Sequence, residues 1–120
     1  MNETREDNFY KFLEEAISML PEVFKDHLKN VAIFVKDYPD KKVGNGLLLG
    51  LYEGVPNPFK NSLGYSFLLP DKISLFRKNI EKMALIKNIA ISKVIREVLY
   101  HEIGHHLGFS EEDLRNLSSL

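Results

Sequence analysis

The spacing of apolar residues changes twice along this 120-residue chain, and these changes constrain its fold more than any other feature. In 9–20 the apolar residues recur every three or four positions, which is typical of one face of a helix, and Pro21 opens a short second helix. The helical spacing returns from residue 79 onward. Between these regions, short apolar segments bounded by turn-forming residues predict strands at 31–35, 47–52, 65–69 and 73–76. We therefore expect one α+β domain over residues 1–120, with a small mixed sheet of three to four strands packed against helices.

The balance of charge and the lack of cysteine exclude several classes of site. Sixteen Lys and Arg residues stand against 17 Asp and Glu residues, so the chain lacks the positive excess that nucleic-acid binding requires. With no cysteine in the sequence, any metal must be bound by His, Asp or Glu. The acidic N-terminus and the shortness of the longest apolar run, 47–52, predict neither an export signal nor a membrane segment. We expect a cytoplasmic protein.

One short segment, residues 101–105, carries the catalytic pattern H-E-x-x-H. His101 and His105 are four residues apart, so on a helix they lie about 40° apart around the axis and both imidazoles can reach one metal ion. Glu102 follows the first histidine, which places its carboxylate beside the ion rather than on it. Zinc lowers the pKa of a bound water to about 7, and Glu102 is predicted to take a proton from that water as a general base.

A catalytic zinc site needs a third protein ligand. Gly108 stands where longer versions of the motif turn the chain back, and ten residues after the first histidine the sequence places Glu111. A carboxylate is an accepted zinc ligand, so the predicted ligands are the two motif histidines and Glu111. The alternative third ligand is Asp113, although its spacing from Ser110 also fits a helix-capping pair.

Residues 101–111 resemble the H-E-x-x-H-x-x-G-x-x-[D/E] motif of the minimal zincin-like metallopeptidase family, whose members are small bacterial proteins. Two upstream stretches extend the resemblance, L-G-L-Y-E-G-V-P at 49–56 and P-D-K-I-S-L-F-R at 70–77. The resemblance implies a zincin-like fold, bound zinc and metallopeptidase activity on a peptide or protein substrate. It also implies that Glu102 is the catalytic base. The zinc ligands that it implies are His101, His105 and Glu111. The family usually has aspartate at the last of these positions.

Two functions of different classes fit this sequence. The first is hydrolysis of amide bonds, in which Glu102 passes the proton from water to the leaving nitrogen. The second retains zinc only as a structural ion in a non-catalytic domain that binds a protein partner, because 120 residues leave little room for the second lobe of larger zincins. A third hypothesis is a metal-free scaffold that inherited the motif from a metal-binding ancestor.

Several other residues are candidates for supporting roles. His106 is predicted to point about 100° away from His105, as a core residue or as a support behind the metal ligands. His27 lies in the short second helix and is given no specific role. The group that stabilises a developing oxyanion stays open among three residues, Arg77, Tyr52 and His106.

Overall fold

The computed structural model describes residues 4–40, 47–54 and 70–118. In chain order its elements are α1 (Arg5–Ser18), α2 (Glu22–Leu28), β1 (Val31–Lys36), β2 (Gly50–Glu53), β3 (Asp71–Phe76), α4 (Arg77–Lys87), α5 (Ile91–His106) and α6 (Glu111–Ser118). Along the chain, helices precede and follow the three strands. The fold is therefore α+β, as predicted. The predicted strand at 65–69 lies outside the described residues.

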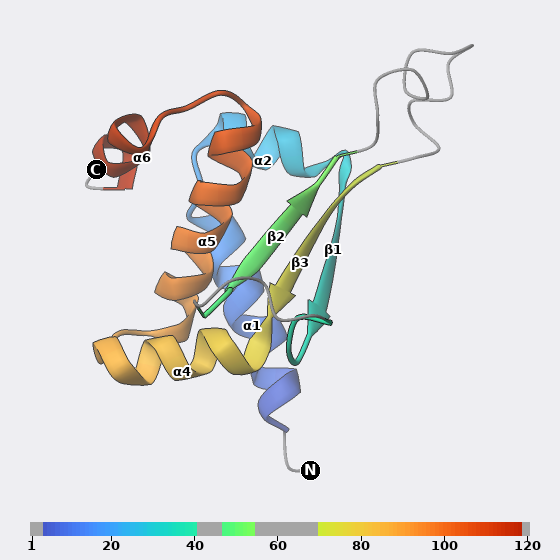
Figure 1. The fold of residues 1–120 in the computed structure, drawn as a ribbon, viewed down its shortest axis with the longest axis vertical. Coiled ribbons are helices and arrows are strands. Elements are labelled where there is room, and N and C mark those ends of the chain that lie inside the picture. The colour runs from blue at the N-terminus through green and yellow to red at the C-terminus, as the bar shows by residue number, and fades with distance from the viewer. Residues whose placement is uncertain (1–3, 41–46, 55–69, 119–120) are drawn as a thin grey trace.

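The three strands of the described chain form one mixed sheet in the order β1-β3-β2. β1 runs parallel to β3, with Val31 opposite Asp71. β2 runs antiparallel to β3, with Tyr52 opposite Ile73. β2 therefore forms an edge of this sheet, beside α5 in Figure 1.

The strand predicted at 47–52 is wrong in its first three residues, because pairing with β3 begins at Gly50. The preceding residues are held by bonds outside the regular pairing. The Asn79 side-chain amide donates to the Leu48 carbonyl at 2.8 Å, and the Leu49 carbonyl accepts from the Phe76 N–H at 2.9 Å. The apolar character of this segment thus reflects its position beside α4 and α5 rather than strand formation.

The core lies between the sheet and the helices, with α5 at its centre (Figure 1). Alternate residues of β3 point to the same side of a strand, and Ile73 and Leu75 are fully buried there. Asp71 occupies the next position in this alternation and is only 3% exposed. A carboxylate therefore stands at the end of a row of core residues, where burial is costly unless polar partners surround it.

The chain turns sharply after α5, and this turn positions α6. Gly108 has a φ of 91°, a left-handed conformation that favours glycine and ends the helix. α6 then packs back on α5, with Leu114 buried against Gly104. A methyl group at Gly104 would overlap the Leu114 side chain, so the close approach of the two helices requires glycine at this position.

α5 is the longest of the described helices, with 16 residues. A helix that crosses a membrane needs about 20 predominantly apolar residues, and none of the helices in the described ranges meets that requirement.

Candidate metal centre

α5 carries His101 and His105 one turn apart, and both side chains are exposed. Their ring centroids are 6.2 Å apart, with the ring planes inclined by 55°. The opposite side of the helix is fixed in the core by buried residues such as Leu99 and Ile103. The exposed side therefore presents two neighbouring imidazoles to solvent.

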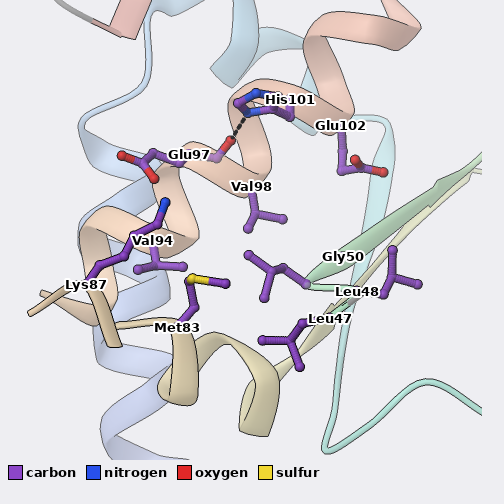
Figure 2. A pocket seen from close by; sticks show the side chains of 11 residues that line it. Leu47, Leu48, Gly50, Met83, Lys87, Val94, Glu97, Val98, His101 and Glu102 are labelled. Atoms are coloured by element: carbon purple, nitrogen blue, oxygen red, sulfur yellow. Dashed lines mark hydrogen bonds between the residues drawn. The ribbon is translucent and has the colours of Figure 1, made fainter. Parts of the chain in front are cut away.

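The His101 ring is oriented by the helix itself. Its Nδ1 atom lies 2.9 Å from the Glu97 carbonyl oxygen, as the dashed line in Figure 2 shows. A carbonyl oxygen only accepts hydrogen bonds, so Nδ1 carries the proton and Nε2 carries the lone pair. Histidines that bind metals commonly donate their second ring nitrogen to a carbonyl or carboxylate in this way. The bond therefore prepares Nε2 of His101 as a metal ligand.

Glu102 lies beside His101 and points toward β2 (Figure 2). Its Oε1 atom accepts a hydrogen bond from the Tyr52 backbone N–H at 3.0 Å. Burial raises the pKa of the Glu102 carboxyl above its usual range, although the Tyr52 N–H and the two neighbouring histidines act in the opposite direction. A raised pKa brings a carboxylate closer to the basicity that a general base needs near neutral pH.

The predicted third ligand lies at the start of α6. Glu111 is the first residue of that helix, and its side chain lies outside the described residues. The side chain of Asp113, the alternative ligand, is engaged with Ser110 instead. Its carboxylate accepts from the Ser110 N–H at 3.0 Å, and its own N–H donates to the Ser110 hydroxyl at 3.1 Å. These bonds lower the pKa of Asp113 and make it half of a helix cap.

These donors fit a zinc ion in their chemistry. Imidazole nitrogen and carboxylate oxygen are both common zinc ligands, and catalytic zinc sites combine two histidines with one carboxylate in several enzymes. One of the two imidazoles already has its ligand tautomer fixed. His101 and His105 would therefore hold the ion, and the third position would come from α6.

A cavity of about 330 Å³ adjoins His101 and Glu102. It lies between the segment before β2 and the helices α4 and α5, as Figure 2 shows. Most of its walls are aliphatic or thioether side chains, contributed by Leu47, Leu48, Leu49, Met83, Val94 and Val98. Lys87 and Glu97 also line the cavity. A mainly apolar cavity thus opens directly beside two residues of the H-E-x-x-H motif.

Of the three candidates for oxyanion stabilisation, Arg77 is engaged elsewhere. It follows the end of β3 and is buried, with one guanidinium nitrogen 3.0 Å from Asp37 and another 3.2 Å from Glu81. The contacts of Tyr52 and His106 lead instead to a second polar cluster.

That cluster includes two residues to which the sequence assigned no role, His27 and Asp71. The Tyr52 hydroxyl donates to Asp71 at 2.5 Å and lies 2.9 Å from Nε2 of His27. The His106 ring stacks on the Tyr52 ring with centroids 4.2 Å apart. The strand predicted at 73–76 leaves out Asp71, whereas β3 begins at Asp71. The sequence therefore provided no signal for Asp71 as a core-facing carboxylate, and nothing distinguished His27.

Comparison with known proteins adds one finding. A family model described as zincin-like metallopeptidase matches residues 28–119, which include all three described strands and the H-E-x-x-H helix. A search of curated proteins finds no match.

Proposed function

Because the chain belongs to the zincin-like metallopeptidase family, we propose that it is a zinc-dependent peptidase that hydrolyses amide bonds in peptides or proteins. In this proposal His101, His105 and Glu111 hold the metal and Glu102 is the general base. The observation that carries it is the position of Glu102, a half-buried carboxylate between a pair of imidazoles and the edge strand.

Zinc, when bound, supplies a Lewis acid that polarises the carbonyl of the substrate and makes water a stronger nucleophile at neutral pH. The protein supplies the proton transfers. Oε1 of Glu102 is held by the Tyr52 N–H, so Oε2 is the oxygen that takes the proton from the attacking water. The same carboxyl then gives that proton to the leaving nitrogen as the C–N bond breaks. Partial burial favours this proton transfer, because it raises the pKa of Glu102 and so lowers the free-energy cost of protonating the carboxylate.

The cavity beside Glu102 supports a preference for apolar substrates. An apolar side chain of the substrate that leaves water for these aliphatic walls makes binding more favourable by about 25 cal/mol per Å² of buried surface. A volume of about 330 Å³ accommodates one large side chain. We therefore propose that cleavage occurs next to an aliphatic or aromatic residue of the substrate.

Replacing Glu102 with glutamine tests the proposal. Peptides from a trypsin-digested proteome serve as the probe, and new cleavage sites are identified by mass spectrometry. We expect the zinc-loaded protein to cut next to apolar residues and E102Q to be about 10²–10⁴-fold slower. Zinc content should be unchanged in E102Q, since Glu102 is not a ligand.

The matched control is Glu14→Gln, the same chemical change at an exposed position on α1. It should cleave at the rate of the parent protein. Cleavage by E102Q at the parent rate, or no cleavage by zinc-loaded parent protein, would contradict the proposal.

A further inference from the structure

Three metal-ligating side chains meet at a place that shares no residue with the H-E-x-x-H pair. They are His27 of α2, Asp71 of β3 and His106 of α5, and their ligand atoms all lie within 4.8 Å of one another. We call this group the three-element cluster. The parent elements are far apart in sequence, but α2, the start of β3 and the end of α5 lie at the same end of the molecule in Figure 1.

The separation of His106 and Asp71 in the three-element cluster suits two metal ligands better than a direct hydrogen bond. Nε2 of His106 and Oδ2 of Asp71 are 3.4 Å apart. Charge-assisted N–H···O bonds are shorter, typically about 2.7–2.9 Å. Two ligand atoms that each lie about 2.1 Å from a tetrahedral ion are separated by about 3.4 Å. The observed separation therefore leaves the room that a shared ion needs.

The carboxylate of the three-element cluster is held as metal-binding carboxylates usually are. Asp71 is almost completely buried, and the Tyr52 hydroxyl donates to its Oδ2 atom. A carboxylate oxygen only accepts hydrogen bonds, so the phenol is the donor in this contact. Ligating carboxylates are commonly oriented by such a hydrogen bond from outside the metal's own ligands.

The two imidazoles complete the donor set. Nε2 of His27 lies 2.9 Å from the Tyr52 hydroxyl oxygen, whose proton already goes to Asp71. Nε2 of His27 is therefore the donor in that contact. On binding, a metal ion displaces this proton, and the Tyr52 hydroxyl moves away from the ring nitrogen while it keeps its bond to Asp71. The His106 side chain is 38% exposed, which gives an ion access from solvent and leaves space for water as a fourth ligand.

We propose that His27, Asp71 and His106 bind a second divalent transition-metal ion, and that this ion ties α2 to β3 and α5. Two imidazoles and one carboxylate suit zinc. The ion is structural, because it links three elements of the core instead of facing the cavity. Tyr52 connects it to the H-E-x-x-H helix, since its side chain orients Asp71 while its backbone donates to Glu102.

The test removes the first pair of histidines and asks whether metal binding survives. The full-length H101Q/H105Q variant is loaded with zinc, separated from free metal, and analysed by elemental mass spectrometry. We expect two zinc ions in the parent chain, one in H101Q/H105Q and none after His27→Gln is added. Added zinc should also raise the melting temperature of H101Q/H105Q, and His27→Gln should abolish that rise.

Two controls keep the outcome clear. Asp26→Asn changes an exposed carboxylate next to His27 on α2 and should retain the zinc of H101Q/H105Q. The second control is the melting temperature in chelator. If it is equal with and without His27→Gln, the variant is folded. If His27→Gln lowers the melting temperature in chelator, Tyr52→Phe in H101Q/H105Q replaces it as the test of zinc binding. Tyr52→Phe keeps all three ligands and should weaken zinc binding about 10–100-fold.

The proposal is overturned if zinc-loaded H101Q/H105Q holds no zinc, or if its zinc is retained with unchanged affinity after both His27→Gln and Tyr52→Phe. Neither result depends on peptide cleavage. The failure of this second site is therefore distinguishable from failure of the proposed peptidase activity.

Discussion

The H-E-x-x-H pair and the three-element cluster share helix α5 but differ in exposure and in the origin of their donors. His101 and His105 come from one helix and face solvent, and His101 also lines a cavity. The three-element cluster draws on three elements and is centred on a buried carboxylate. An exposed site beside a cavity can admit a substrate, whereas a site that links three core elements restrains the fold. We therefore propose catalysis at the first site and stabilisation of the fold at the second.

The largest effect on the exposed site should come from changing Leu114, the buried residue that packs α6 on α5. Leu114→Ala removes a buried side chain and should lower the free energy of unfolding by about 2–5 kcal/mol. It should also weaken zinc binding at the H-E-x-x-H pair, since Glu111 opens the same helix. Urea denaturation in chelator and zinc titration check both effects. The control Leu107→Ala changes an exposed leucine; equal unfolding free energies for the two variants would contradict the proposed anchor.

The next effect separates the two acidic residues of α6. Glu111→Gln should weaken zinc binding at the exposed site by more than about 100-fold, because loss of a ligand exceeds the effect of losing a supporting residue. Asp113→Asn is the matched control, since the Asp113 carboxylate is bonded to Ser110, and it should leave zinc affinity unchanged. Competition with a zinc-binding dye, in chains that also carry His27→Gln, measures the difference. The opposite ranking would identify Asp113 as the ligand.

A smaller effect concerns Tyr52, which contacts both regions. Tyr52→Phe removes the hydroxyl that donates to Asp71 but keeps the backbone N–H that donates to Glu102. Leaving a buried acceptor without its donor costs about 1–3 kcal/mol, so chemical denaturation in chelator should show a loss of that size. Tyr10→Phe, at an exposed tyrosine, should show none. A Tyr52→Phe chain as stable as the parent would remove Tyr52 from the account of the three-element cluster.

The two regions also differ in how far the sequence predicts them. The H-E-x-x-H residues lie within one helix, where a spacing of four residues fixes their relative position. The end of α5 was predictable from a local pattern too, because the chain turns at Gly108 as its place in the motif predicts, and Gly108 has a left-handed conformation there. For the same reason the Ser110–Asp113 cap was visible in the spacing of two residues. Patterns within one element therefore carry their geometry with them.

The three-element cluster was not predictable in this way, because its geometry depends on how separate elements pack. His27 is an ordinary helix residue until α2 is placed against Tyr52. The parallel pairing of β1 with β3 brings the buried Asp71 to the end of the sheet near α2, and sequence spacing does not fix that pairing. The strand predicted at 47–52 was wrong at 47–49 for a related reason, since apolar residues that line a cavity have the same pattern as residues of a buried strand.

The division of roles between the two regions is tested most directly by zinc titration of the His101→Ala variant, followed by melting temperature and by cleavage of the peptide library. We predict that cleavage is lost while added zinc still raises the melting temperature, because the three-element cluster is intact. His27→Gln should show the reverse, with cleavage retained at saturating zinc and a smaller rise. Retained cleavage in His101→Ala, or loss of its zinc-induced rise in melting temperature, would contradict the account.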